Sequence, residues 1–250
     1  IVDNSIENLN ILAAYVTQVN TIFADGGGKV NSASTETVLL NAKYKVMDGV
    51  SVTGYGYLIE NFGDTYGLSV TGKPKLNDTL SLDYRVEYAI LGDTSFDTAG
   101  VVKNDASYYN VLLGVNMSGV LAAINYEVQS GDDTAADGIN GTFSTPLGTN
   151  HGHNGWADKF LATPAQGLVD ANIMIGYKSK DIGVFKALYH DFTSDVGSLN
   201  YGTEVDFLYK RSVPGVEGVT GMLKYANYSA DVYSVDTQKM WVMLDYKFSN

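Results

Sequence analysis

Two of the three histidines stand one residue apart, in a segment that could bind a transition metal. His151 and His153 are followed by Asp158, and imidazole and carboxylate groups are ligands for such ions. A structural metal site needs further ligands in fixed positions, and this segment supplies none. We therefore expect no metal here, and we predict a loop that folds on itself or into the mouth of the protein, anchored by Trp156 and Phe160.

Other segments with ligand-like residues do not match the spacing of known sites. Residues 25–29 contain three glycines before a lysine but lack the full pattern of a phosphate-binding loop. Asp132, Asp133 and Asp137 are not spaced as in an EF-hand calcium loop. No set of serine, histidine and carboxylate, and no pair of carboxylates, is arranged for catalysis. The sequence therefore predicts neither an enzyme nor a bound cofactor.

Most of the other charged side chains alternate with apolar ones. Asp83, Arg85 and Glu87 alternate with leucine, tyrosine and valine, a period of two that predicts a β-strand with one apolar and one charged face. Several charged faces that enclose water would form a lumen, although neighbouring strands could also use such charges as cross-strand pairs. The side chains predicted to line the lumen are Lys43, Lys45, Asp83, Arg85, Glu87, Glu127, Asp170, Lys178, Lys186, His190, Glu204, Asp206, Lys210, Lys224 and Lys239. The predicted constriction or gating segment contains His151, His153, Trp156, Asp158 and Lys159.

About twelve strands are needed to position these residues, an even number typical of antiparallel bacterial barrels. They are predicted at residues 8–17, 37–46, 49–59, 65–73, 79–90, 107–117, 120–129, 168–179, 182–191, 200–211, 219–227 and 237–248. All four prolines fall in the connections, as expected because proline cannot donate to a strand ladder. We predict an all-β, antiparallel up-and-down transmembrane β-barrel, with residues 1–250 as a single domain.

Tyrosines indicate which face of the strands meets lipid. The chain has 18 of them, and most lie near a strand end on the apolar side, such as Tyr88 and Tyr201 at one end and Tyr177 and Tyr209 at the other. Amphipathic rings settle at the two headgroup levels of a membrane. The packed core of a soluble sandwich would give no reason for rings at both edges. The apolar faces are therefore predicted to face lipid.

The connections alternate between short turns and long loops. The long set is 18–36, 91–106, 130–167, 191–199 and 228–236, with 60–64 as a brief exception. Outer-membrane barrels have short periplasmic turns and long external loops, so we expect the 130–167 loop to narrow the passage from outside. The external connections hold fifteen acidic and three basic residues, a difference equal to the whole net charge of −12. This predicts mild cation preference, unless lysines cluster on one wall of the constriction.

Composition excludes several classes of protein. The net charge of −12 disfavours nucleic acid as a partner, and the absence of cysteine excludes disulfides and thiolate metal sites. No apolar run is long enough for a transmembrane helix. The chain begins at Ile1, without methionine, just before a strand-like run, and we expect a processed chain or a fragment that lacks N-terminal strands.

Four segments together resemble the alginate-export family of outer-membrane porins. One is the histidine segment continued through residues 161–168, and the others are residues 14–20, 188–192 and 241–248. The resemblance implies a monomeric barrel of about eighteen strands, of which this chain would be the C-terminal part. It also implies transport of anionic polysaccharide or small solutes. Lysines would supply the positive charge along the path, because the chain has only two arginines.

We predict a channel in the bacterial outer membrane for passive diffusion of small solutes or export of polysaccharide, in contact with membrane lipid and lipopolysaccharide. An alternative from another class is a structural or sheath barrel that holds a partner protein, such as an electron-transfer component. A secreted soluble β protein is a third possibility. Steady single-channel conductance separates the first two classes, and insolubility without detergent excludes the third.

Overall fold

Antiparallel strands make up most of the described chain. The computed structural model describes residues 1–20, 31–95, 103–132, 139–145 and 154–248. Within them, one sheet of 13 strands follows chain order from β1 to β15, while β7 and β10 pair separately in parallel. The strands are β1 (Val2–Asp3), β2 (Leu9–Asn20), β3 (Asn31–Met47), β4 (Val50–Ile59), β5 (Gly63–Gly72), β6 (Leu80–Gly92), β7 (Lys103–Asn104), β8 (Ala106–Met117), β9 (Val120–Gln129), β10 (Ile139–Asn140), β11 (Leu168–Ser179), β12 (Gly183–Thr193), β13 (Asn200–Ser212), β14 (Val219–Ala230) and β15 (Thr237–Tyr246).

The twelve strands predicted from alternation are all present, and each overlaps one long strand of the sheet. The largest difference is in β3, which begins at Asn31 rather than near residue 37. Its ladder with β2 continues through polar residues, which carry no apolar signal in the sequence. The strands β1, β7 and β10 were not predicted, because two residues are too few to show a period.

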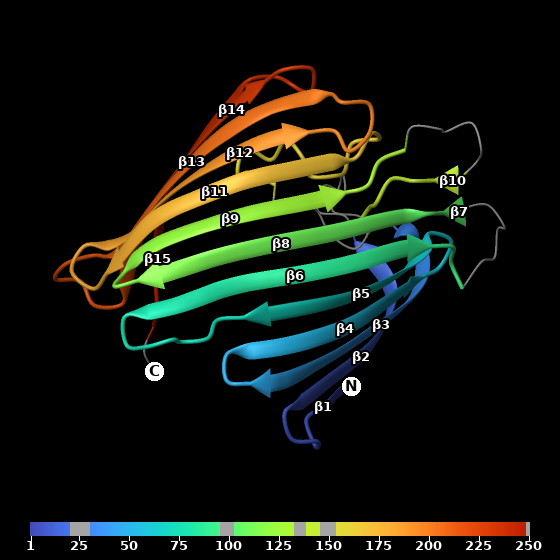
Figure 1. The fold of residues 1–250 in the computed structure, drawn as a ribbon, viewed down its shortest axis with the longest axis horizontal. Helices are drawn as coiled ribbons and strands as arrows, with labels where there is room; N and C mark the ends of the chain where they lie inside the picture. Colours follow the sequence, from blue (N-terminus) through green and yellow to red (C-terminus); the bar gives the residue numbers. More distant parts are fainter. Residues whose placement is uncertain (21–30, 96–102, 133–138, 146–153, 249–250) are drawn as a thin grey trace.

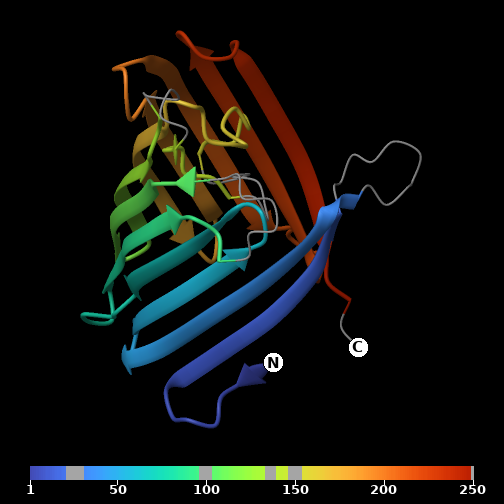
Figure 2. The same ribbon diagram turned by 90° about the vertical axis from the view of Figure 1, so that its right-hand side faces the viewer.

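The sheet curls into the wall of a barrel, as two perpendicular views show (Figure 1, Figure 2). Short connections, such as the turn between β8 and β9, gather at one end of the strands, and most of the longer ones lie at the other (Figure 1). The two edges are β1 and β15, and no ladder joins them among the described residues. Because the sheet is curved, strand alternation assigns each side chain to a concave or a convex face.

The convex face is apolar and the concave face is polar. Ile175, Val242 and Leu244 are 64%, 74% and 77% exposed on the convex side, whereas Asp170 and Glu204 on the other side are fully buried. Proteins that fold in water show the opposite arrangement, and an outward apolar band is the pattern of a barrel in lipid. The predicted all-β, up-and-down barrel fold is confirmed. In the described part of the chain, no helix has the length and apolar character to cross a bilayer.

Most girdle tyrosines lie on the convex face as predicted, including Tyr15, Tyr88 and Tyr177. The prediction for Tyr201 is wrong, because this residue is only 1% exposed and packs on the concave side. The ladder between β12 and β13 shifts register at this level. Gly202 adopts a φ of +121°, which is open to glycine, and the resulting bulge turns Tyr201 inward. A regular alternation from the sequence could not show this shift.

The two tyrosines of β4 that oppose its aliphatic residues lie on the concave face. The hydroxyl of Tyr55 donates to Glu87 Oε1 at 2.7 Å, and its ring stacks on that of Tyr57 with centroids 5.1 Å apart. A Cβ at Gly67 on β5 would lie 2.1 Å from the Tyr55 ring. Glycine at this position therefore lets the ring lie across the neighbouring strand.

Candidate channel lumen

Strand alternation places the fifteen predicted lining residues on the concave face. The ladders set them side by side: Glu127 pairs with Asp170 across β9 and β11, and His190 pairs with Glu204 across β12 and β13. A cavity of about 590 Å³ lies against this face. Five of the predicted residues contact it, and uncharged neighbours that were not predicted complete it. The five are Lys43, Asp83, Arg85, Glu127 and His190, and the neighbours include Asn110, Asn125 and Asn172.

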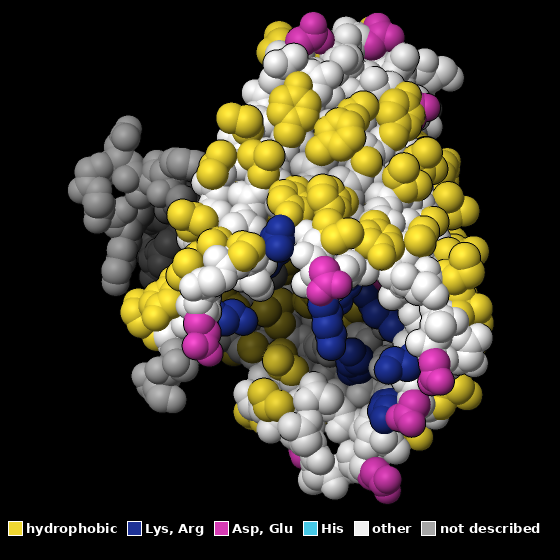
Figure 3. Space-filling view, turned by 90° about the vertical axis from the view of Figure 1, so that its left-hand side faces the viewer, with side chains coloured by type: hydrophobic (Ala, Val, Ile, Leu, Met, Phe, Trp, Pro, Cys, Tyr) yellow, Lys and Arg dark blue, Asp and Glu magenta, His cyan; other side chains and the backbone are white. Residues whose placement is uncertain are grey.

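Four lysines on neighbouring strands form a basic patch near the short-turn end. On β11 and β13, Lys178 and Lys210 both pair with Val184. On β12 and β14, Lys186 and Lys224 both pair with Leu208, so the four lysines alternate between two neighbouring rows of the concave face. None of the four has an ion pair with another described residue. Seen from this end, dark-blue side chains surround a hollow (Figure 3). Lys178, Lys186 and Lys210 therefore offer uncompensated positive charge to the lumen.

Other basic residues form ion pairs, but most of these pairs lie within one strand or turn and not across neighbouring strands. Lys73 and Asp83 approach to 2.8 Å between neighbouring strand ends, and Arg85 lies 3.8 Å from Glu87. Lys45 contacts Asp48 in the turn after β3, and this lysine lowers the pKa of the Asp48 carboxyl. Paired charges contribute less to the field in the lumen than the four lysines of the basic patch.

Toward the long-loop end, the lining becomes acidic and buried. His190 Nδ1 lies 2.9 Å from Asp170 Oδ1, and His190 Nε2 lies 3.7 Å from Asp206 Oδ2. Glu204 and Asp206 are fully buried on the next strand, and Glu127 is 9% exposed. These five side chains, which we call the acidic cluster, require partners because buried charges are costly without them.

The segment after the histidines covers the acidic cluster. The backbone N–H groups of Trp156 and Ala157 donate to Glu204 Oε1, the second at 2.7 Å. A Cβ at Gly155, whose φ is +77°, would lie 2.5 Å from Glu204 Oε2, so this close approach needs glycine. Asn154 accepts a hydrogen bond from Gln129 Nε2 at 3.1 Å. Residues 154–157 thus dock on the lumen wall through a buried carboxylate.

Side-chain contacts fix the same segment to β14 and β15. Lys239 Nζ donates to Asp158 Oδ2 at 2.7 Å. The Lys224 ammonium lies 4.2 Å from the Trp156 ring centroid and 4.9 Å from that of Trp241, distances at which a cation is attracted to an aromatic face. Two basic residues predicted to line the lumen therefore also hold the segment in place.

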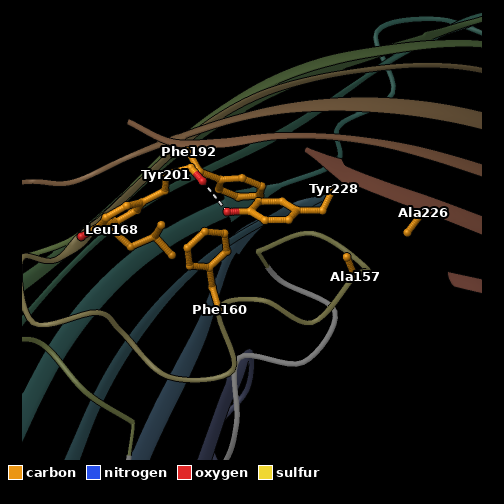
Figure 4. Packing of buried hydrophobic residues seen from close by; sticks show 7 residues of the cluster. All are labelled: Ala157, Phe160, Leu168, Phe192, Tyr201, Ala226 and Tyr228. Carbon is orange, nitrogen blue, oxygen red and sulfur yellow. Dashed lines mark hydrogen bonds between the residues drawn. The ribbon is translucent and has the colours of Figure 1, made fainter. Parts of the chain in front are cut away.

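A hydrophobic cluster completes this attachment, and Phe160 is its centre (Figure 4). Its ring centroid lies 4.5 Å from that of Phe192 and 5.9 Å from that of Tyr201, and it stacks on Tyr233 at 5.2 Å. The Tyr228 hydroxyl donates to the Tyr201 carbonyl, the dashed line in Figure 4. The loop cluster, as we name it, contains Ala157, Phe160, Leu168, Phe192, Tyr201, Ala226 and Tyr228.

The predicted gating residues are only partly brought together. Trp156 and Asp158 hold the segment to the wall as described, and Lys159 Nζ lies 5.9 Å from the Tyr228 ring centroid. His151 and His153 lie outside the described residues. In the part of the chain that is described, no group of three or more histidine and carboxylate side chains could hold a metal ion. Gln129 and Asn154, which join the segment to the lumen wall, were not predicted as site residues. Strand alternation would have placed Gln129 on the concave face.

No protein-family model and no curated protein matches the chain, but solved structures do. OpdQ of Pseudomonas aeruginosa has a TM-score of 0.76 and 16% identity, over 98% of this chain and 69% of OpdQ. For OccAB3 of Acinetobacter baumannii, the TM-score is 0.71 and the identity is 17%, over 99% of this chain and 66% of OccAB3. OpdK of P. aeruginosa, solved with vanillate, has a TM-score of 0.72 and 12% identity, over 98% of this chain and 66% of OpdK. The chain therefore spans about two thirds of the length of these proteins.

These neighbours correct the family resemblance drawn from short segments. They are substrate-specific outer-membrane porins of the Occ and Opd group, not alginate-export porins, so the alginate-export assignment is wrong. Three of the four segments that suggested it, residues 14–20, 188–192 and 241–248, lie mainly in strands, and strand and girdle residues are shared by unrelated barrels. Transport of anionic polysaccharide finds no support in these neighbours. The outer-membrane location of the neighbours agrees with the location predicted for this chain.

Proposed function

We propose that the chain forms the wall of a passive outer-membrane channel for small solutes. The observation that carries this proposal is the inverted surface, with apolar side chains outside and charged ones inside, on a fold shared with porins. Water in the polar lumen and the lining side chains replace part of the hydration shell of a solute as it passes. The fifteen predicted residues act as lining, and the docked segment of residues 154–160 narrows the passage.

We expect steady, ohmic single-channel conductance when the full-length protein is reconstituted in a planar lipid bilayer. A polar lumen connects the two compartments, so current should rise linearly with voltage. The control is unfolded protein that has not formed the barrel. Its folding state is checked by its mobility on a gel before and after heating. Correctly folded protein that gives no conductance would contradict the channel and favour the sheath alternative.

We further propose that small organic anions, such as monocarboxylates, pass in preference to cations. The basic patch lies on one wall without ion pairs among the described residues. Within the acidic cluster, Glu204 and Asp206 are fully buried, and the backbone of residues 156 and 157 covers Glu204. Exposed charge controls the field in a narrow aqueous path more than covered charge does. OpdK, which was solved with vanillate, binds a ligand of this size and charge.

Reversal potentials under a KCl gradient test this selectivity. The unmodified channel should prefer chloride, and Lys186→Gln with Lys210→Gln should lower its permeability ratio for chloride over potassium roughly twofold, because two unpaired cations leave the lumen. Lys75→Gln removes one exposed cation from the turn between β5 and β6 and should have no such effect. Preference for potassium in the unmodified channel would show that the acidic external loops determine selectivity instead.

A further inference from the structure

A groove of about 540 Å³ crosses the convex face of the barrel over β9, β11, β12, β13 and β14. Its lining is almost entirely apolar. In one row of the ladders, Ala122, Ile175, Ala187 and Phe207 follow one another across the strands. The two alanines leave space beside the larger side chains. The volume falls in the range of about 300–1,000 Å³ typical of small-molecule sites.

The groove ends toward the short turns in a pair of stacked rings. Phe185 and Tyr209 face each other with centroids 4.4 Å apart and an interplanar angle of 21°. The Tyr209 hydroxyl donates to the carbonyl of Ile182 at 3.1 Å, so it points toward the turn between β11 and β12. This orientation puts the polar tip of the ring at the boundary between lipid and water, as in a tyrosine girdle.

Arg211 is the next residue of β13 on the convex face, two residues after Tyr209. It is exposed, and no ion pair or side-chain hydrogen bond joins it to another described residue. Its ladder partner is Gly221, where an added Cβ would find no atom nearer than 3.8 Å. Its other neighbour is Gly183, whose Cβ position lies 3.0 Å from the Arg211 Cβ. Glycine on both sides leaves the guanidinium accessible from the membrane.

We propose that this groove and Arg211 bind one phospholipid of the periplasmic leaflet. The guanidinium pairs with the lipid phosphate, because its planar fork matches phosphate oxygens. One acyl chain fills the groove over Ala187. Lys180, exposed in the adjacent turn, adds positive charge near the headgroup. The short turns face the periplasm in barrels of this kind, and the leaflet on that side consists of phospholipid. The site lies outside the lumen and is independent of conduction.

Charge complementarity favours a lipid over other occupants of the groove. A neutral apolar chain would use the groove but leave Arg211 without a partner at the membrane boundary. A stable interface with a second copy would need about 800 Å² from each partner, together with an acidic group for Arg211. A phospholipid supplies both the chain and the phosphate in one molecule, in the leaflet where the site lies.

Native mass spectrometry of the full-length protein in dodecyl maltoside tests the site. With added palmitoyl-oleoyl phosphatidylglycerol, the unmodified protein should retain one lipid at low lipid concentration, in preference to dioleoylglycerol, which lacks the phosphate. Arg211→Gln should lower retention of phosphatidylglycerol about threefold, as expected for one partly exposed ion pair. Ala187→Phe should lower retention of both lipids, because the ring fills the groove.

Two matched variants serve as controls. Lys75→Gln removes a cation from another turn at the same end, and Ala42→Phe adds the same ring to the convex face of β3. Neither should change retention. Equal binding of the two lipids by unmodified protein, or equal retention by all four variants, would overturn the site and leave only a general lipid annulus. If the unmodified protein shows the mass of a dimer and Arg211→Gln does not, the lipid site would be overturned, and a second copy of the chain would be the occupant of the groove.

Discussion

Phe160→Ala should release residues 154–160 from the lumen wall and increase single-channel conductance about twofold. The Phe160 ring contacts Phe192, Tyr201 and Tyr233 and is only 1% exposed. Truncation of a buried phenylalanine to alanine costs about 3–5 kcal/mol. The two backbone hydrogen bonds to Glu204 contribute about 1.5–3 kcal/mol each, so the ring accounts for about as much of the attachment as both hydrogen bonds together. Loss of the ring should therefore free the segment to move away from the acidic cluster.

Single-channel recordings and limited proteolysis of folded protein in detergent measure this effect. Cleavage within the segment should become faster as the conductance rises. Leu161→Ala is the matched control, since Leu161 follows directly in the chain but is 42% exposed. It should leave both measurements as they are. Unchanged conductance in Phe160→Ala, with the same cleavage rate as the unmodified protein, would show that the segment does not limit the passage.

Ile173→Arg should destabilise the folded barrel in lipid by about 2–4 kcal/mol, the cost of an arginine at the bilayer midplane. Ile173 lies in the middle of β11 on the convex face, 53% exposed, between Ile124 and Tyr189 on the neighbouring strands. Asn172→Arg places the same side chain one residue earlier, on the concave face. There it loses one hydrogen bond to Asp170 but gains a carboxylate neighbour, and the change should stay within about 1 kcal/mol.

Urea titration of the full-length protein in lipid vesicles, followed by tryptophan fluorescence, gives both free energies of unfolding. The comparison is internal, because the two variants add the same group to adjacent residues of one strand. In vesicles, Ile173→Arg should lower the free energy of unfolding more than Asn172→Arg does. In detergent micelles, which adapt to the added charge, this difference between the two variants should vanish. Similar losses for both variants in vesicles would refute the assignment of the convex face to lipid.

The strands and their two faces could be predicted because their information is local. In β6, Asp83, Arg85 and Glu87 alternate with apolar residues, and a period of two fixes a strand and the opposition of its faces whatever lies beside it. The outward orientation of the apolar faces could also be predicted, because tyrosines mark the apolar side near both ends of the strands. The face of the sheet on which the charged residues lie could be predicted for the same reason.

The family assignment failed because short segments of a barrel are dominated by these shared requirements. Strand alternation, girdle aromatics and turn residues recur in barrels of different families, so similar short runs do not separate alginate-export porins from the Occ and Opd porins that the fold resembles.

Residue patterns alone predict an all-β chain with about twelve long strands, a tyrosine-marked apolar face and a charged face. They also indicate that Trp156 and Phe160 anchor the long loop. Three features could be seen only in the folded chain. Glu204 accepts hydrogen bonds from the backbone of that loop, four lysines form one patch, and Tyr201 turns inward. Those features depend on ladder register and on contacts between residues far apart in the chain. A one-residue shift reverses the face of every side chain beyond it, and no local pattern records where such a shift occurs.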